Sequence, residues 1–366
     1  MRSTVIISDS LTFLAASWIY FKVGQIENLL CHLIVVAYPG LILIDHGHFQ
    51  YNCVSLGLVI FSVSALRKDY DILSCVMFCL SLSFKQMSLY YALPYFFYFL
   101  GKCLKEAYYK SQISGLKSLI KISLSVILTI GIVCSPFLFD SNNIIHILNR
   151  IFPLDRGIFE DKVSNIWCVL NLFYKFKIKM SNSAMAAMCS AVTLVAVLPS
   201  SVNILLNPRK DMFLLSLINS SLAFFLFSFQ VHEKSILLVA LPVMFYFKHD
   251  PLHCFWFLLI STFSMLPLFK KDGLVIPFLI LSVFYIIVFV SFDQFSHLES
   301  AKHMKLGHLM FSFVGCCILT FCILFVNPPT KYPDIFPLLI SVYSACHFVG
   351  FFVYFNYKQI AFRFKI

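Results

Sequence analysis

Thirteen apolar segments, separated by short hydrophilic loops, follow one another along this chain of 366 residues. A helix needs about 20 mostly apolar residues to cross the roughly 30 Å hydrocarbon core of a bilayer. The clearest segments are 117–138, 184–204, 212–230, 252–269, 273–292, 307–326 and 335–355. The pattern therefore predicts an all-α polytopic membrane protein with about 13 transmembrane helices.

The other six segments are short or carry a charge: 3–20, 28–44, 233–247 and the three parts of the stretch 53–101. Polar residues break that last stretch twice, and we interpret it as three crossings. Residues 3–20 are predicted to be a retained span rather than a signal peptide. Asp9 interrupts their apolar core, and no small-residue cleavage site follows before Lys22.

Composition supports the bilayer as the solvent of this chain. Hydrophobic residues make up 60% and charged residues 12%, against about 45–50% and 25% in soluble proteins. The net charge of +11 lies in short gaps between apolar runs, which argues against nucleic acid as a partner. No CxxC pair occurs beside a matching histidine or cysteine pair, so the sequence gives little support to a zinc site, and no metal is expected. We predict one membrane domain, 1–366, with a lumenal loop at 139–183.

Basic residues in short loops indicate the orientation of the spans. The tail after 355 and the loop 102–117 are both rich in lysine and are interpreted as cytoplasmic. Thirteen crossings then place Arg67-Lys68 and Arg209-Lys210 on the cytoplasmic side as well, whereas Lys270-Lys271 falls on the lumenal side. The C-terminus is predicted to be cytoplasmic. Asn219 fits the N-glycosylation pattern but lies within a predicted span, so we expect it to be unmodified.

In this topology four polar clusters gather on the lumenal side, at 45–52, 85–86, 150–165 and 230–234. Ionisable groups at helix ends are costly to bury unless they are paired or line a wet cavity, so their convergence predicts a polar site at the membrane surface. The candidate residues for binding a donor or an acceptor are Asp45, His46, His48, Gln50, Asn52, Lys85, Gln86, Arg156, Glu160, Asp161, Lys162, His232, Glu233 and Lys234.

Each cluster also has an ordinary explanation. Asp45 and its histidine neighbours can satisfy a helix end, and Lys85 can extend its ammonium group to the interface. The charges at 156–162 fit a solvated loop, and those at 232–234 can compensate one another. A transporter would spread its charges along a path through the membrane midplane. Here the charges cluster on one face, which favours an enzyme site.

The same clusters carry a resemblance to a known family. Four motifs resemble the dolichyl-phosphate-glucose-dependent alpha-1,3-glucosyltransferases of the endoplasmic reticulum: YPGLILIDHGHFQYN (38–52), SFKQMSLYYALP (83–94), RIFPLDRGIFEDKVSNIWC (150–168) and FQVHEKSILLVALP (229–242). The resemblance covers essentially the whole chain. It is stronger to the enzymes that add the first glucose than to the paralogues that add the second, particularly at Gly47, Gln86-Met87 and 159–162.

This resemblance implies a GT-C-type glycosyltransferase fold in the endoplasmic reticulum membrane, with its active face in the lumen. The implied reaction moves glucose from dolichyl-phosphate-glucose to the dolichyl-pyrophosphate oligosaccharide Man9GlcNAc2, with inversion and without a cofactor or an obligatory metal. Inversion needs one general base and no covalent glycosyl-enzyme.

The resemblance also suggests roles for the candidate residues. Positive side chains contact phosphate and pyrophosphate, namely Lys85, Arg156, Lys162 and Lys234. We expect Glu160, Asp161 and Glu233 to orient the basic groups. The residues expected to bind the sugar or order the site are Asp45, His46, His48, Gln50 and Asn52.

Members of the resembling family carry a first span and an acidic lumenal loop ahead of the position that Met1 occupies here. We therefore expect this chain to lack both, and no general base is assigned to any of its residues. The alternatives to this first-glucose transferase are the paralogous second-glucose transferase and a truncated, non-catalytic family member that binds lipid-linked oligosaccharide or a partner.

Overall fold

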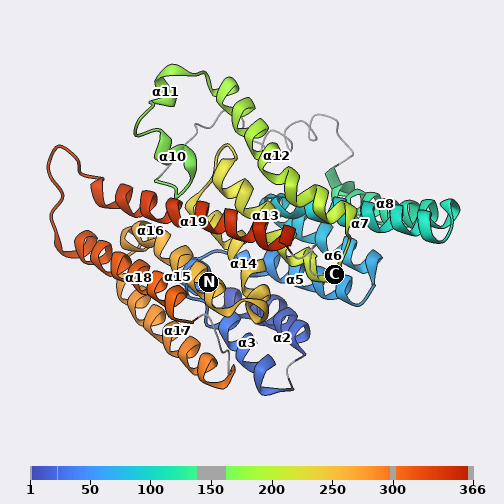
Figure 1. Cartoon of the computed structure of the whole chain (residues 1–366), viewed down its shortest axis with the longest axis horizontal. Helices are drawn as coiled ribbons and strands as arrows, with labels where there is room; N and C mark the ends of the chain where they lie inside the picture. The colour runs from blue at the N-terminus through green and yellow to red at the C-terminus, as the bar shows by residue number, and fades with distance from the viewer. Residues whose placement is uncertain (1, 23, 138–161, 297–301, 362–366) are drawn as a thin grey trace.

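The computed structural model describes residues 2–22, 24–137, 162–296 and 302–361, and in these ranges the chain consists of helices and connecting loops without a β-strand (Figure 1). The elements of the first part are α1 (Arg2–Asp9), η1 (Ser10–Leu14), α2 (Ala15–Phe21), α3 (Ile26–Val36), α4 (Pro39–Ile42), η2 (Leu43–Gly47), α5 (Asn52–Arg67), α6 (Asp71–Phe84), η3 (Gln86–Tyr91), α7 (Ala92–Tyr109), α8 (Gln112–Cys134) and η4 (Ser135–Phe137).

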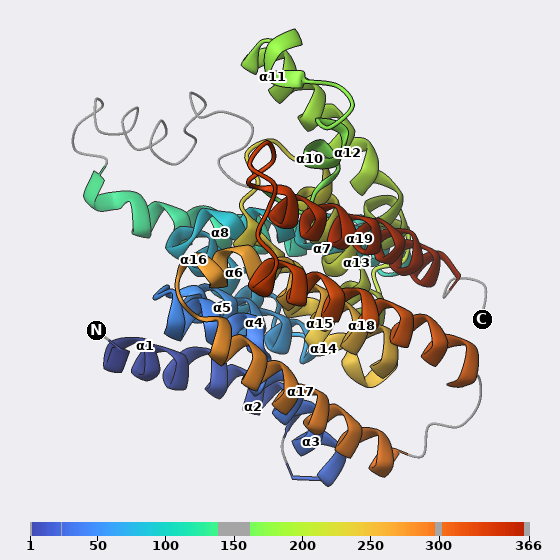
Figure 2. The ribbon, with the colours of Figure 1, turned by 90° about the vertical axis from the view of Figure 1, so that its left-hand side faces the viewer.

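The second part begins with two short helices. The first, α10, packs against α13 and α19, whereas α11 stands out from the body together with the start of α12 (Figures 1 and 2). Its elements are α10 (Ile166–Leu170), α11 (Phe176–Lys179), α12 (Asn182–Leu206), α13 (Lys210–Phe227), η5 (Glu233–Ser235), α14 (Ile236–Tyr246), η6 (Phe247–His249), α15 (Pro251–Ser264), α16 (Leu266–Lys271), α17 (Val275–Ser296), α18 (Lys302–Phe325) and α19 (Ile335–Ala361).

Each of the thirteen predicted spans falls on a helix or on a group of consecutive helices. By length and composition, these candidate membrane spans stand out among the described residues: Ser3–Phe21, Glu27–Gly47, Gln112–Phe137, Asn182–Leu206, Lys210–Phe227, Gly307–Phe325 and Ile335–Ala361. Shorter apolar helices account for several of the others. The all-α membrane fold is confirmed, and the number of crossings stays a prediction.

Helices α13 and α14 form the centre of the bundle. Every residue of α14 is buried, as expected of a helix that is apolar on all sides. Helix α13 packs against α14, α12, α7 and α19, and α19 crosses in front of it in Figure 1. On the other side of the bundle, α17 packs against α3 (Figure 2). The central pair therefore holds the two halves of the chain together.

Helix α8 shows that lipid must surround this molecule. It projects from the body in Figure 1, and Gly115 is its one buried residue. Many of its apolar side chains are more than half exposed, as at Ile113, Leu116, Ile120 and Ile127. An apolar surface of this extent is unfavourable in water, whereas hydrocarbon covers it without loss.

Two glycines allow helices to approach closely, which is a common device in membranes. A Cβ atom on Gly57 of α5 would lie 2.7 Å from the backbone carbonyl carbon of Thr12 in η1. A Cβ atom on Gly101 of α7 would lie 2.3 Å from the carbonyl oxygen of Leu205 in α12. Any larger residue at either position forces the two backbones apart.

A buried polar network joins α12, α13 and α19. The Gln359 side-chain oxygen Oε1 accepts hydrogen bonds from Asn219 Nδ2 at 2.7 Å and from Ser200 Oγ at 2.7 Å. Asn219 also donates to the Phe355 carbonyl oxygen at 3.2 Å and is 1% exposed. The expectation that Asn219 carries no glycan stays a prediction, and its burial inside the bundle supports it.

Replacing this asparagine tests the network. We expect Asn219→Ala to lower the free energy of unfolding by about 1 kcal/mol, because interhelical hydrogen bonds in membranes are worth roughly that amount. Thermal denaturation in detergent micelles measures the effect. Asn356→Ala is the control, since Asn356 donates within its own helix to the Phe352 carbonyl oxygen. A melting temperature for Asn219→Ala equal to that of wild type contradicts the prediction.

Candidate functional site

The centre of the candidate site is the buried carboxylate of Asp45, which is 1% exposed. Asp45 lies in the π-helical turn η2, a geometry that is frequent at functional sites. After this turn Phe49 adopts a left-handed backbone conformation (φ 67°), and the chain bends back so that α5 begins beside Asp45. The Asp45 carboxylate then accepts hydrogen bonds from Cys53 N at 2.6 Å and from Asn52 Nδ2 at 2.7 Å. It therefore satisfies backbone and side-chain donors at the N-terminus of α5.

Lys85 joins this network from the break between α6 and η3. Its backbone is extended (φ −144°, ψ 114°), which ends α6. Its ammonium group donates to the Asn52 side-chain oxygen and, at 3.5 Å, to Gln50 Oε1. Burial lowers the pKa of Lys85, the charge of Asp45 opposes this shift, and the charge of Lys234 adds to it. Lys85 is therefore an ammonium group that a nearby anion would stabilise.

Lys234 reaches the same region from the turn η5. Its ammonium group lies 3.1 Å from His48 Nε2, and His48 Nδ1 lies 2.6 Å from the Asp272 carboxylate. A lysine ammonium can only donate, so His48 accepts at Nε2 and donates from Nδ1 to Asp272. This chain of contacts orients Lys234 from the loop after α16.

Lys85 and Lys234 line one cavity of about 210 Å³. Gln50, Asn52 and His232 complete its polar side, and its apolar floor is formed by Leu56, Met87, Leu237 and Leu238. Two ammonium groups at one cavity match in charge an anion with several oxygens, such as a phosphate.

A larger cavity of about 720 Å³ lies on the other side of the turn at 232–234. Glu233 lines this cavity, whereas its neighbours His232 and Lys234 line the smaller one. The larger cavity also contains Lys162, which forms an ion pair with Asp334 at 3.3 Å. Lys270 and Lys271 add two further basic side chains. One turn thus contributes to two neighbouring polar cavities.

The structure brings most of the described candidates together. Gln50, Asn52, Lys85, His232 and Lys234 line the smaller cavity, Asp45 and His48 support it, and Lys162 and Glu233 line the larger one. His46 turns away, and its Nε2 is hydrogen-bonded to the Asp9 carboxylate of α1 at 3.1 Å. Gln86 is exposed and lines neither cavity. Arg156, Glu160 and Asp161 lie outside the described residues.

Sequence reasoning missed three acidic residues near the site, Asp9, Asp272 and Asp334. Asp9 had a signal, since a charge inside an apolar span is unusual and marks a function or a partner. The loop at 270–272 had a weaker signal, because the topology places it on the same side as the other clusters. For Asp334 the sequence offers no comparable pattern.

In the described parts of the chain, no group of three or more histidine, cysteine, aspartate or glutamate side chains is placed to hold a metal ion. The positive groups at the two cavities are side chains. They belong to Lys85 and Lys234 in the smaller cavity and to Lys162, Lys270 and Lys271 in the larger one.

The fold and the cavities define a polytopic membrane protein with a polar site at one end of its helices. The chain belongs to the ALG6, ALG8 glycosyltransferase family, whose model matches residues 1–355. This finding confirms the resemblance seen in the motifs.

Among its relatives is the dolichyl pyrophosphate Man9GlcNAc2 alpha-1,3-glucosyltransferase of Gallus gallus, which is 40% identical over 97% of this chain and 75% of the relative. The probable enzyme of the same name from Drosophila melanogaster is 40% identical over 99% of this chain and 76% of the relative. The probable enzyme from Arabidopsis thaliana is 37% identical over 98% of this chain and 69% of the relative. The chain thus spans about three quarters of the first of these relatives.

The role of Asp45 in ordering the site can be tested without measuring activity. We expect Asp45→Ala to lower the free energy of unfolding by about 2–4 kcal/mol, because it leaves two buried donors without an acceptor. Asp45→Asn keeps one oxygen that can accept a hydrogen bond from Cys53 N. The decrease in its free energy of unfolding should therefore be clearly smaller than that of Asp45→Ala. Thermal denaturation in detergent compares the two variants. Equal melting temperatures for both are incompatible with this role of the carboxylate.

Proposed function

We propose that this protein transfers glucose from dolichyl-phosphate-glucose to the Man9GlcNAc2 oligosaccharide on dolichyl pyrophosphate, forming an alpha-1,3 linkage in the endoplasmic reticulum membrane. The names of the relatives support the acceptor and the linkage. The observation that carries the donor assignment is the convergence of Lys85 and Lys234 on one cavity.

The reaction explains why two ammonium groups are needed there. A hydroxyl oxygen of the acceptor mannose attacks C1 of glucose, and the bond between C1 and the phosphate oxygen breaks with inversion. The electron pair leaves with dolichyl phosphate, whose negative charge increases by one, and the hydroxyl proton passes to a general base. Lys85 and Lys234 stabilise the charge that develops on the leaving phosphate, which lowers the barrier. Asn52 and Gln50 hold Lys85 in position.

The larger cavity suits the acceptor. Lys162, Lys270 and Lys271 provide positive charge for a pyrophosphate, while Glu233 and Asp334 can accept hydrogen bonds from sugar hydroxyls. Its position across the turn at 232–234 brings a bound acceptor next to the proposed donor phosphate.

The presence of an apolar groove supports the proposal that the substrates carry isoprenoid chains. The groove has a volume of about 380 Å³ and is lined by α15, α17 and α18, with side chains such as Leu259, Val283 and Phe321. Near the end of α18 two consecutive residues line the two spaces, Ile323 the larger cavity and Leu324 the groove. A lipid chain in this groove would carry its head group to the polar cavity.

We place the active face in the lumen and the C-terminus in the cytoplasm. The positions of the basic loops support this orientation. The candidate site lies at the start of α5 and of α14, whereas Arg67 and Lys68 lie at the opposite end of α5.

The first test of this function is the lipid-linked oligosaccharide profile of cells that lack the first glucosyltransferase. We expect expression of this chain to convert Man9GlcNAc2 to a glucosylated species. Lys85→Met and Lys234→Met should each reduce conversion by a factor of about 10²–10³, because each removes a cation that faces the leaving group.

Lys105→Met is the control, since Lys105 is an exposed lysine on α7 away from both cavities. It should convert as wild type does. The proposal fails if Man9GlcNAc2 persists with the chain present in the membrane. It also fails if both site variants retain full conversion.

The lowered pKa of Lys85 predicts the pH dependence of transfer. Lys85 acts as an ammonium ion, so activity should fall as pH rises through its pKa, which is below that of an ordinary lysine. Lys85→Arg keeps its charge at high pH, so the alkaline fall should move to higher pH even if the maximal rate is lower. A pH profile of initial rates with the protein in detergent micelles measures this. Superimposable alkaline limbs for wild type and Lys85→Arg would rule out the titration of Lys85 as the cause.

A further inference from the structure

A second basic cavity lies at the end of the helices opposite to the candidate site. It has a volume of about 330 Å³ and is lined by Lys22, Arg67, Lys68, Lys248 and His249, which follow or end α2, α5 and η6. Helix α5 connects the two ends, because Asn52 at its start lines the smaller site cavity and Arg67 at its end lines this one. Its 16 residues separate the two cavities by about 24 Å.

Positive charge is in excess around this cavity. Glu27 pairs with Lys248 at 3.1 Å, and the charge of Asp211 acts on His249. Asp69, which follows Lys68, is already paired with Lys210 and, at 3.5 Å, with Lys102. Burial lowers the pKa of His249, Asp211 opposes this shift, and Arg67 and Lys248 add to it. The cavity therefore has a positive field that the neighbouring acids compensate only in part.

Contacts within the protein hold the side chains that line this second basic cavity in place. The Arg67 guanidinium lies 4.7 Å above the ring of Tyr20, which is buried at 8% exposure. This cation–π contact fixes the guanidinium at the cavity wall. Lys22 ends α2 in a left-handed conformation (φ 50°). The basic groups therefore belong to a shaped wall.

A buried hydroxyl points to an occupant of this cavity. Ser64 of α5 lines it and is 7% exposed, yet its hydroxyl has no hydrogen-bond partner among the residues that the structure describes. Buried hydroxyl groups are normally paired. The Ser64 oxygen is itself enclosed, so its side chain must rotate about χ1 before the hydroxyl can donate to an anion with several oxygens in the cavity.

Compensation of helix dipoles and the orientation rule for lysine and arginine both account for basic residues at these helix ends. Neither requires that the residues line one cavity, and neither explains the hydroxyl of Ser64. An apolar strip on the same helices provides a further clue. Ile7, Leu11 and Trp18 are 57%, 69% and 52% exposed along α1, η1 and α2, and Ile19 lines the cavity itself.

We propose that this cavity binds the phosphate head group of an anionic glycerophospholipid, with an acyl chain lying along the strip of Ile7, Leu11, Trp18 and Ile19. Basic cavities between membrane helices are suited to such head groups. The apolar strip favours a membrane lipid over a soluble anion, because it continues from the cavity wall along the helix. This site is separate from the proposed transferase site and does not depend on the transferred sugar.

The test is lipid binding to the purified chain in detergent, measured by native mass spectrometry with added phosphatidylserine or phosphatidylcholine. We expect wild type to retain one phosphatidylserine more tightly than phosphatidylcholine. Lys22→Gln/Lys68→Gln removes two exposed cations and should weaken phosphatidylserine binding roughly 25-fold, about fivefold for each cation. Ser64→Ala should weaken it roughly tenfold and leave folding intact.

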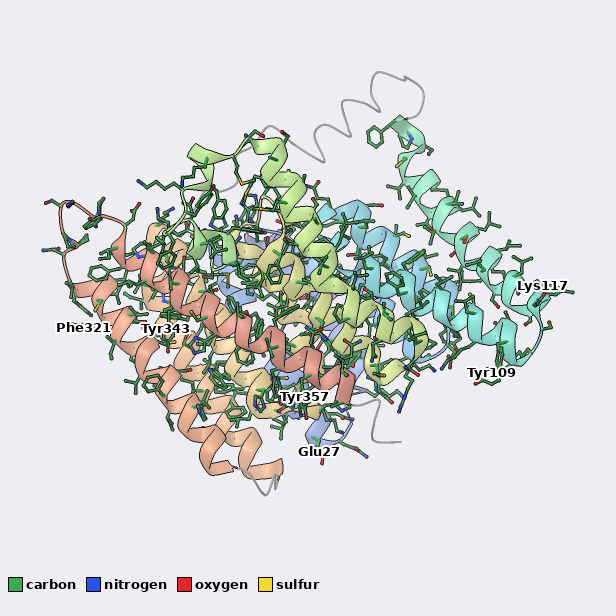
Figure 3. All side chains as sticks on the ribbon, turned by 45° about the horizontal axis from the view of Figure 1, so that its top comes forward. Glu27, Tyr109, Lys117, Phe321, Tyr343 and Tyr357 are labelled. Carbon is green, nitrogen blue, oxygen red and sulfur yellow. The ribbon has the colours of Figure 1, made fainter. Side chains whose placement is uncertain are left out.

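Lys105→Gln/Lys117→Gln is the matched control, because it removes the same charge from exposed lysines of α7 and α8. Figure 3 shows Lys117 far from Glu27, the partner of Lys248 at the cavity. Equal phosphatidylserine affinity in wild type, Lys22→Gln/Lys68→Gln and Ser64→Ala overturns the proposal. Equal binding of the two lipids to wild type also overturns it. Complete displacement of the lipid by millimolar inorganic phosphate overturns the assignment to a lipid and leaves a site for a soluble anion.

Discussion

A charged or unpaired polar group in hydrocarbon has no water to stabilise it, and the arrangement of this protein depends on that constraint. Helices satisfy their own backbone groups, so apolar helices such as α14 can fill the middle of the structure. Several polar side chains that remain in the interior pair with one another, as Asn219 does with Gln359. The free charges are therefore concentrated at the two ends of the bundle, where both the candidate site and the basic cavity lie.

The candidate site is built from interruptions of helices. Asp45 lies in the π-helical turn η2, and Lys234 lies in the turn η5. Lys85 is the extended residue that ends α6. Each interruption exposes side chains that a continuous helix would direct to lipid or to neighbouring helices. Because the three interruptions occur at the same end, segments that are distant in the sequence face one cavity.

The two ends of the bundle differ in how their positive charges are held. At the candidate site Lys85 and Lys234 are fixed by Asn52, Gln50 and His48, which places two ammonium groups around a space large enough for a phosphate. At the opposite end a cation–π contact and an unpartnered hydroxyl shape the cavity wall. In both places bringing like charges together is unfavourable until an anion arrives, which favours anion binding in each.

Much of this protein could be predicted from the sequence. The thirteen apolar segments all fall on helices, because lipid imposes a hydropathy pattern that can be recognised one segment at a time. The motifs around Asp45, Lys85 and His232 were enough to indicate the family and the residues at one end of the bundle. Such features are local, so a single stretch of sequence contains them.

Only the tertiary structure decided which of these residues meet. It paired His46 with Asp9 rather than placing it in the cavity, left Gln86 exposed, and brought Asp272 to His48 across 224 positions of the chain. It also gathered the basic ends of α2, α5 and η6 around one cavity. Hydropathy reports how deep a residue lies, whereas the packing of helices against one another sets the direction in which its side chain points. That direction depends on residues far away in the sequence, which is why the contacts could not be predicted from it.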